Sequence, residues 1–327
     1  MLSHTRSISS VDYASLAGKQ VVLVHHHVYP FLQEDVKTLK ILGSSNGLIC
    51  LGISDSKNVS NLRRIYIWNP STNEYKQISC STFDDRDYCF RAKYGFGYDN
   101  SIDDYKVVRI LGRDSCEYHE CLDIQVYTLG SDPWHRVQTV PYSFACEKRF
   151  SSLLFNGALH WLAYNVASQG QGKSWEVIVA FEISKERHLH LLLPKETIKG
   201  WREVGNDKKR LGVLGDCICL SISFLVHGRT DIWIMQDYGV QDSWTKQFTI
   251  TQLQMHKYFS CKPIWTFENG EILLETVKDL IVYDPKSGNI RTAMRDTDLS
   301  VNRECYVGSL ISVKSGTYVE KTDFFIV

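Results

Sequence analysis

Two stretches decide how this chain folds: Asn46–Gly52, NGLICLG, and Ile65–Ile78, IYIWNPSTNEYKQI. In the first, an Asn-Gly turn dipeptide leads directly into an apolar run of strand length, which is a strong hairpin signal. In the second, a strand centred on Trp68 runs into Asn, Pro and Ser residues that turn the chain back toward another short strand. Together they predict a unit of short antiparallel strands.

The same unit recurs along the chain. Turn dipeptides again precede apolar runs at Asn156-Gly157, Gly215-Asp216 and Asn269-Gly270. The aromatic strands are centred on Trp68, Tyr127, Phe181, Trp233 and Tyr283, at intervals of 59, 54, 52 and 50 residues. Residues 94–112, YGFGYDNSIDDYKVVRILG, supply the inner hairpin of the second unit. Each unit therefore indicates four short antiparallel strands, which is the construction of a propeller blade.

Five units are visible, and a sixth can be assembled from the two ends of the chain. Its strands would come from ECYVGSLISV, residues 304–313, and from QVVLVHHHVYPF and VKTLKIL, residues 20–31 and 36–42. Closing the ring in this way removes two exposed sheet edges. We expect an all-β, β-propeller-like fold of six four-stranded blades closed by N- and C-terminal strands, with five or seven blades as alternatives.

Composition limits the function. The 37 Lys and Arg residues balance 37 Asp and Glu residues, so no overall field attracts nucleic acid or an anionic membrane. The first residues hold no signal-peptide core, and no run of about 18 apolar residues suggests a membrane span. We therefore expect a cytoplasmic or nuclear protein. The ten cysteines are scattered without a CxxC pair, which favours buried free thiols over a zinc site.

Motifs that could carry chemistry have simpler explanations. Residues 43–47, GSSNG, match the G-x-S-x-G pattern, but a strand follows where a nucleophile elbow needs a helix. In a strand, His25-His26-His27 would point to alternating faces, and no ligand pattern completes a metal site. Asp84-Asp85-Arg86-Asp87 is explained by a solvated loop, and no phosphate-cradling glycine pattern occurs. We predict no catalytic residue, no cofactor-binding residue and no metal ligand.

The chain resembles the plant F-box-associated interaction domain, the region that follows the F-box in large plant families including the pollen S-locus F-box proteins. The resemblance rests on phrases whose order and spacing match over about residues 40–290, among them SSNGLICL, IWNPSTNEYKQI, YGFGYDNSIDDYKVVRI, FNGALHWLA, DIWIMQDYG and IVYDPKSG. It implies a kelch-like propeller that captures target proteins for ubiquitination by an SCF-type E3 ligase.

The start of the chain departs from that family pattern. An F-box is a Leu-rich helical segment that binds a Skp-type adaptor, whereas MLSHTRSISS looks like the tail that follows one. We expect residues 1–20 to be such an N-terminal segment, 21–315 the propeller domain and 316–327 a C-terminal tail. The expected partners are target proteins for ubiquitination, with Skp-type adaptor and cullin only if an F-box is supplied, and neither nucleic acid nor membrane.

Long connections on a rigid propeller are the natural place for recognition. The candidates are residues 79–93, 113–122, 165–175 and 195–210. Within them, the predicted partner-binding residues are Asp84, Asp85, Arg86, Asp87, Trp175, Trp201 and Arg202. Exposed Trp and Arg side chains dominate interface energetics. The alternative is that Trp175 and Trp201 pack between blades.

A second class of function is a propeller enzyme, either a glycan-processing hydrolase or an oxidase, with its site at the central channel. We expect the innermost strands to be LICLG, ALHWLAY, CICLSIS and EILLE, which would place chiefly His160 and Glu271 near the axis. Three or more titratable residues with shifted pKa values around one pocket would favour this alternative over a binding module.

Overall fold

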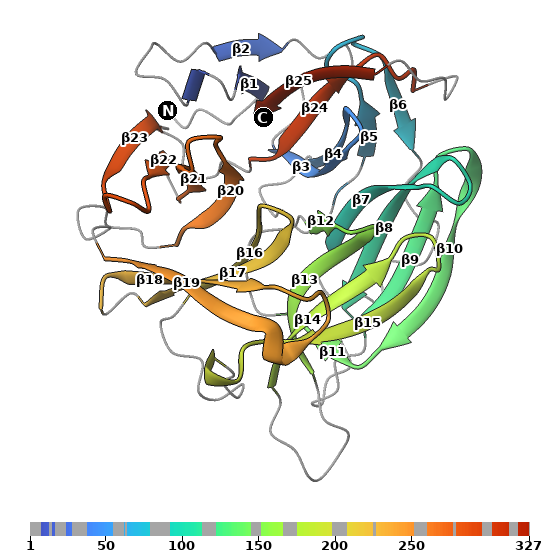
Figure 1. Ribbon diagram of the computed structural model, residues 1–327. Helices are drawn as coiled ribbons and strands as arrows, with labels where there is room; N and C mark the ends of the chain where they lie inside the picture. The colour runs from blue at the N-terminus through green and yellow to red at the C-terminus, as the bar shows by residue number, and fades with distance from the viewer. Residues whose placement is uncertain are drawn as a thin grey trace.

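The computed structural model shows six antiparallel sheets arranged in a ring around a central axis (Figure 1). The structure describes residues 8–12, 15–16, 24–27, 38–54, 62, 64–78, 92–112, 122–144, 152–165, 175–197, 208–224, 227–251, 260–276, 279–295, 303–313 and 320–326. No helix in this described part has the length and apolar character needed to cross a membrane. The prediction of an all-β propeller is confirmed.

Five blades are each built from one continuous segment. Blade 1 contains β3 (Thr38–Ser45), β4 (Leu48–Ser54), β5 (Arg64–Trp68) and β6 (Tyr75–Ile78). Blade 2 contains β7 (Lys93–Asp99), β8 (Asp104–Gly112), β9 (Leu122–Thr128) and β10 (Ser131–Val140). Blade 3 contains β12 (Leu153–Phe155), β13 (Ala158–Asn165), β14 (Trp175–Glu182) and β15 (Arg187–Leu192), with β11 (Tyr142–Ser143) also paired to β13.

Blades 4 and 5 repeat the pattern. Blade 4 contains β16 (Lys208–Leu214), β17 (Cys217–Phe224), β18 (Arg229–Met235) and β19 (Trp244–Ile250). Blade 5 contains β20 (Lys262–Thr266), β21 (Ile272–Glu275), β22 (Asp279–Tyr283) and β23 (Ile290–Arg295). The 3-10 turns η2 (Lys195–Thr197) and η4 (Gln241–Ser243) are the short helical elements in this half of the ring.

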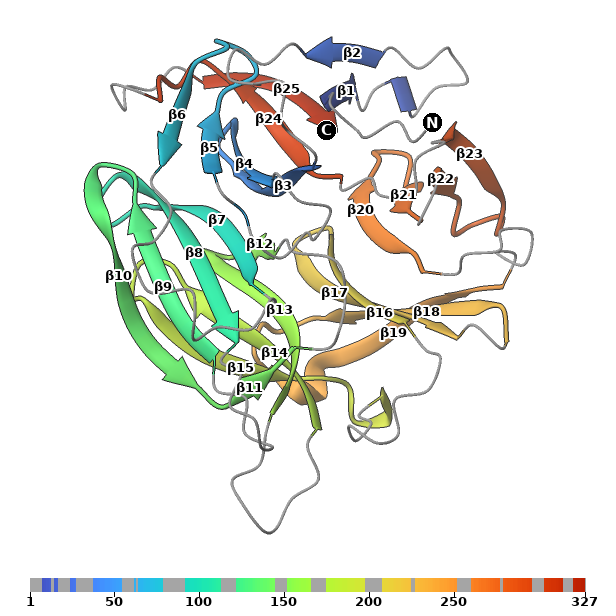
Figure 2. The ribbon, with the colours of Figure 1, turned by 180° about the vertical axis from the view of Figure 1, so that it is seen from behind.

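The sixth sheet joins the two ends of the chain, and we call it the closing sheet. Its order is β2 (Val24–His27), β1 (Ile8–Asp12), β25 (Glu320–Ile326) and β24 (Cys305–Ser309). Both chain ends therefore lie at one place in the ring (Figure 1 and, from behind, Figure 2). The sequence predicted six four-stranded blades. The structure has five blades that are each built from consecutive strands, and its sixth sheet combines strands from both ends of the chain.

The predicted composition of that sheet was partly wrong. VKTLKIL forms β3 in blade 1, because its chain continues through the Asn46-Gly47 turn into β4. The closing sheet instead takes β1 from the segment expected to lie before the propeller, and β25 from the segment expected to be a tail. Neither strand belongs to the repeat, so the repeat spacing could not reveal them.

The turns that the sequence predicted form as expected. Asn46 and Gly47 have φ of 47° and 82°, and Asn156 and Gly157 have φ of 48° and 68°. Positive φ at both central residues matches the right-handed twist of the paired strands. Blades 1 and 3 thus begin with tight hairpins, β3–β4 and β12–β13.

The core lies between blades, in six apolar clusters that pair each sheet with its two neighbours. Phe96 of blade 2 packs with Leu42 of blade 1, and Ile8 and Tyr306 of the closing sheet pack with Trp68 of blade 1. Because every sheet has an apolar partner on both sides, the ring is closed. The described cysteines Cys50, Cys219 and Cys261 are buried free thiols within it, as predicted.

A buried ionic contact also links blades 2 and 3. The Lys106 ammonium lies 2.8 Å from Asp99 and 2.7 Å from Glu186, and it donates to the carbonyl of Ile183 at 3.1 Å. Burial opposes ionisation of Asp99, but hydrogen bonds from Lys106 and Ser101 hold its pKa below the usual value. This contact fixes the β14–β15 turn against blade 2.

Candidate functional site

The innermost strand of each sheet is the first strand of its unit, not the second. The strands that meet around the axis are β3, β7, β12, β16, β20 and β24, since β3 contacts β7 and β24, and β16 contacts β20. The prediction that LICLG, ALHWLAY, CICLSIS and EILLE are innermost was therefore wrong. These runs form the second strands, and their uniformly apolar character reflects packing between blades on both faces.

The two residues proposed for the axis consequently lie elsewhere. His160, in β13, has Nδ1 3.2 Å from the Leu153 carbonyl and Nε2 2.8 Å from the Tyr238 hydroxyl. Burial lowers its pKa to about 4. Glu271 lies at the β20–β21 turn, 3.4 Å from Arg291. Both residues have structural partners, and neither lines the axial cavity.

Most of the predicted partner-binding residues lie outside the part of the chain that the structure describes. Asp84, Asp85, Arg86 and Asp87 lie outside the described residues, as do Trp201 and Arg202. Trp175 begins β14, where its backbone pairs with Asn165, but its side chain is outside the description.

The described site is a cavity on the propeller axis, with a volume of about 440 Å³. Every sheet except blade 2 contributes to it. Four are blades: blade 1 through Ser44, blade 3 through β12, blade 4 through β16 and its turn, and blade 5 through β20. The closing sheet contributes the residues at the start of β24. The lining residues are Ser44, Leu153, Leu154, Val213, Gly215, Asp216, Lys262, Pro263, Ile264, Trp265, Thr266, Arg303, Glu304 and Cys305.

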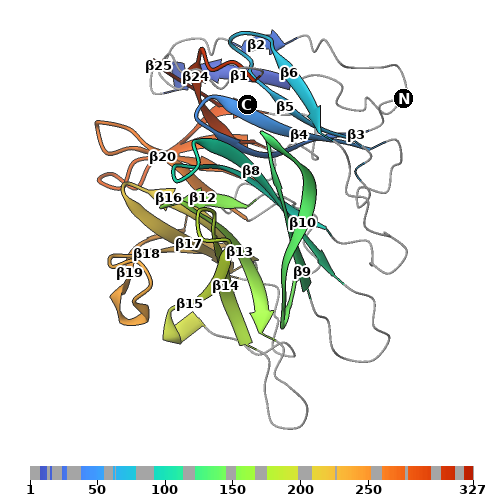
Figure 3. The ribbon, with the colours of Figure 1, turned by 90° about the vertical axis from the view of Figure 1, so that its right-hand side faces the viewer.

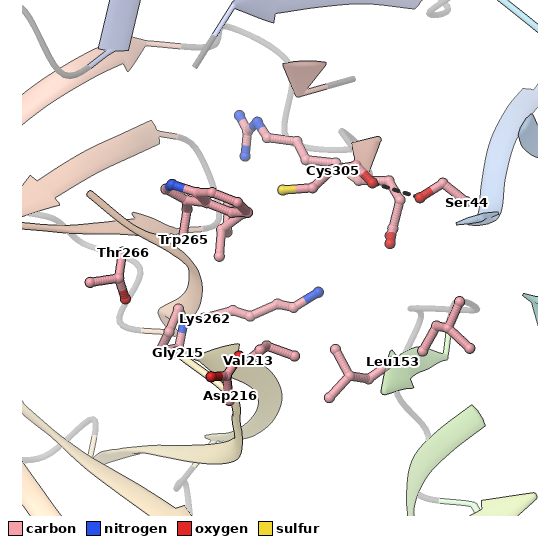
Figure 4. A pocket seen from close by; sticks show the side chains of 14 residues that line it. Ser44, Leu153, Val213, Gly215, Asp216, Lys262, Trp265, Thr266 and Cys305 are labelled. Carbon is pink, nitrogen blue, oxygen red and sulfur yellow. Dashed lines mark hydrogen bonds between the residues drawn. The ribbon is translucent and has the colours of Figure 1, made fainter. Parts of the chain in front are cut away.

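One wall of the cavity is apolar and the opposite wall is polar. Leu153 and Val213 form the apolar side, and Lys262 reaches toward it from β20 (Figure 4). Across the cavity, Ser44 donates its hydroxyl to the Cys305 carbonyl at 2.6 Å, which ties blade 1 to the closing sheet. A volume of this size matches that of pockets for small ligands.

The charged groups of the polar wall differ in their partners. Arg303 Nη1 lies 4.0 Å from Glu275 and 3.5 Å from the Thr276 carbonyl, so this guanidinium is held by blade 5. No hydrogen bond or ion pair joins Lys262 Nζ to another described residue. Oε2 of Glu304 is buried and has no hydrogen-bond partner among the described residues. Burial raises the pKa of Glu304 to about 7, with Lys262 acting to lower it and Glu275 to raise it.

The serine and the cysteine that line the cavity are not activated as nucleophiles. Two described lining groups have shifted pKa values: Glu304, and Cys305, whose thiol pKa burial raises to about 12. Such a thiol is a poor nucleophile at neutral pH, and the Ser44 hydroxyl is already donated to a carbonyl. The described residues contain no group of three or more His, Cys, Asp or Glu side chains able to hold a metal ion. Among the described lining residues, Glu304 and Cys305 have shifted pKa values, one fewer than the three that would favour the enzyme alternative.

Sequence reasoning missed this site because nothing local marks it. Lys262 stands in CKPIW and Glu304 in NRECY, and neither matches a motif. The sequence signal that could have located the cavity was the position of each apolar run relative to its turn dipeptide. Residues before the Asn-Gly turn, rather than after it, face the axis.

Fold and site together define a closed β-propeller with a cavity on its axis that is lined by both apolar and charged side chains. The chain belongs to the F-box associated β-propeller domain family, whose model matches residues 1–313. F-box protein CPR1 of Arabidopsis thaliana is 30% identical over 297 residues, covering 83% of this chain and 68% of that protein. An F-box/kelch-repeat protein of the same plant is 26% identical over 275 residues, with 84% and 68% covered.

A solved structure confirms the architecture from further away. The α-L-arabinanase of Penicillium chrysogenum, complexed with arabinobiose, superposes with a TM-score of 0.52 at 11% identity and covers 98% of each chain. At this identity the likeness shows the fold alone.

Proposed function

We propose that this chain is the target-recognition module of an SCF-type E3 ubiquitin ligase and that it acts by binding, without catalysing a reaction itself. The observation that carries the proposal is the match of the F-box associated propeller family over residues 1–313, together with relatives that are F-box proteins. The chemistry of the axial cavity is consistent with a binding role, because its serine and cysteine lack the partners that would activate them.

Docking to the ligase is assigned to an F-box. The match to CPR1 spans 68% of that protein, so the relative contains sequence beyond the matched stretch. We propose that a Skp-type adaptor and a cullin join the complex only through an F-box, and that the propeller alone contacts the target. The compartment proposed is the cytoplasm, the nucleus or both.

Target contact is assigned to the long connections, with Asp84, Asp85, Arg86, Asp87, Trp175, Trp201 and Arg202 as the proposed partner-binding residues. Acidic residues at 84–87 and the basic residues Lys199, Arg202 and Lys208 would give separate regions of opposite sign on a chain of zero net charge. Lys209 and Arg210 of the same segment are buried in ion pairs with Glu176 and Glu275 and are not part of such a region. Charges arranged in this way select partners and speed correct encounters more than they add affinity.

The test uses two baits in plant cells treated with a proteasome inhibitor: this chain, and this chain fused to an F-box. We expect one set of proteins to be enriched by both baits, with ubiquitin on those proteins rising only for the fused bait. The control bait is the fused chain carrying Asp84→Arg, Asp85→Arg, Trp201→Ala and Arg202→Ala, which should lose the captured proteins and keep the adaptor.

Two results would contradict the proposal. The receptor role is wrong if no protein is enriched by both baits over the control. The separation of roles is wrong if the unfused chain recovers adaptor and cullin as efficiently as the fused one.

A further inference from the structure

The axial cavity contains two polar groups that the fold itself does not use. The Lys262 ammonium extends into the middle of the cavity (Figure 4), with no hydrogen bond or ion pair to another described residue. The Glu304 Oε2 atom is buried and has no hydrogen-bond partner among them. A buried acceptor without a partner costs free energy, and the half-buried Lys262 ammonium, without an ion pair to a described residue, lines the same cavity. Both groups are therefore available to one ligand that contacts them together.

The surroundings of these groups define the chemistry of that ligand. Lys262 offers three N–H donors and a positive charge, which suit an anionic oxygen. Glu304 Oε2 accepts from an N–H or O–H donor. Lys262 extends toward Leu153 and Val213, and Leu154 and the Trp265 ring complete the apolar part of the lining. Asp216 is exposed on the β16–β17 turn at the rim of the cavity.

We propose that the axial cavity binds a free carboxylate attached to a short apolar group. In this pose the carboxylate contacts Lys262, the apolar group packs on Leu153 and Val213, and an adjacent N–H or O–H donates to Glu304. A cationic ligand would instead meet the Lys262 ammonium at the centre of the cavity. A neutral apolar ligand would leave both polar groups unsatisfied.

Two sources share this chemistry: the C-terminal residue of a protein and a free small acid such as an acylated amino acid. In its protein form the inference rests on the proposed function, since the C-terminus would belong to the captured target. In its small-acid form, the inference does not depend on the proposed function. Binding to the purified chain is measured without ligase components, so its failure is distinct from failure of target capture in cells.

The experiment measures binding of four probes to the purified full chain by ligand-observed NMR and calorimetry. The probes are N-acetyl-leucine, N-acetyl-leucinamide, and the peptide Gly-Gly-Gly-Gly-Leu with a free or an amidated C-terminus. Because a hydrogen bond to a charged group is among the stronger ones, we expect each acid to bind about tenfold or more tightly than its amide. Binding of both acids identifies a protein C-terminus as a ligand, and binding of N-acetyl-leucine alone identifies a free small acid.

Variants in blade 5 assign the effect to the cavity. Lys262→Met should remove the preference for the acid, and Lys262→Arg, which keeps the charge, should retain it. Lys286→Met is the matched control, because Lys286 is an exposed residue of the β22–β23 turn in the same blade. Thermal unfolding of each variant checks that the ring is intact.

The proposal is overturned if neither acid binds, if acid and amide bind equally, or if the Lys262→Met protein retains the preference while folded. Loss of the preference in the Lys286→Met protein would also overturn it. Should Lys262→Met fail to fold, equal binding of acid and amide by the Lys262→Arg protein is the contradictory result.

Discussion

Blades 1 to 5 and the closing sheet have the same four-stranded form but are held together differently. In blades 1 to 5, each strand pairs with the next one along the chain, so the connecting turns hold the sheet in place. In the closing sheet, β1 and β25 come from opposite ends of the chain, and their described register consists of two residue pairs, Val11 with Ile326 and Asp12 with Phe325. The repeat builds the blades, whereas contacts distant in sequence close the ring.

Polar contacts tie the closing sheet to its two neighbours, blade 1 and blade 5. Asn69 donates its side-chain amide to the carbonyls of Ser309 and Ile311, at 3.0 and 2.7 Å. Ser309 in turn donates to the Asn46 carbonyl at 2.9 Å. On the other side, Arg291 of blade 5 donates to the Leu16 carbonyl at 2.9 Å. Directional bonds between distant segments therefore replace the short turns of blades 1 to 5. Figure 3 shows the ring from the side, with blades 4 and 5, drawn in yellow to orange, on the left of the view.

Removal of β25 is expected to have the largest effect. Ending the chain after residue 319 takes away the strand between β1 and β24 and exposes two sheet edges. We predict a Tm lowered by about 10 °C or more, or loss of a cooperative transition, by calorimetry. Removing Val327 alone is the control and should leave the transition unchanged. An unaltered Tm in the truncated chain would mean that the closing sheet does not hold the ring.

Asn69→Asp is the next test, because blade 5 carries the matching natural residue. Asp284 occupies the same turn position in IVYDP as Asn69 in IWNP, and both side chains accept from backbone N–H groups of their own turn. Asn69→Asp keeps that role but replaces two donated hydrogen bonds with a buried carboxylate facing carbonyls. We predict a loss of about 3 kcal/mol in the free energy of unfolding, by denaturant titration. Asp284→Asn should cost less than about 1 kcal/mol, and equal losses would refute the special role of blade 1.

A pair of glycine substitutions separates turn strain from contact with the closing sheet. Gly47 and Gly157 both have positive φ, so alanine at either position costs about 1 kcal/mol in strain. A Cβ at Gly157 meets nothing, whereas one at Gly47 collides with Ser309 and lies 2.8 Å from the Val307 carbonyl. We predict that Gly47→Ala costs an additional 1–3 kcal/mol or so. Similar unfolding free energies for the two variants would contradict the close packing of blade 1 on β24.

The smallest effect concerns pH at the start of β24. Because burial raises the folded-state pKa of Glu304 to about 7, the folded protein binds an extra proton and its stability falls as pH rises from about 4.5 through 7. Glu304→Gln should abolish this decline and stabilise the protein at pH 8 by on the order of 1–2 kcal/mol. Unfolding curves at pH 5 and pH 8 measure it. The exposed Glu268→Gln is the control and should change stability by less than about 0.5 kcal/mol at either pH.

The sequence was sufficient to predict the blades because their determinants are local. The Asn46-Gly47 and Asn156-Gly157 turns have the positive φ values that their residue types favour, and Trp68 and Phe181 are fully buried as strand centres. The closing sheet could be predicted only in part, because β1 and β25 have no repeat partner and their pairing depends on ring closure.

The axial site was mislocated for a related reason. Apolarity marked the second strands as buried, but burial between blades and burial at the axis give the same pattern in sequence. The prediction that His160 and Glu271 lie near the axis followed from that error. Lys262 and Glu304 meet only because β20 and β24 are neighbours in space, which no local motif records.

Capture of proteins for ubiquitination is tested most directly by the half-life of a captured protein in plant cells, measured after protein synthesis is stopped. Expression of the F-box-fused chain should shorten that half-life several-fold, and the chain without an F-box should lengthen it by shielding the target. The fused quadruple variant at positions 84, 85, 201 and 202 should have no effect. A half-life unchanged by the fused chain, despite binding of the same protein, would contradict the assignment of this propeller to ubiquitin-dependent target recognition.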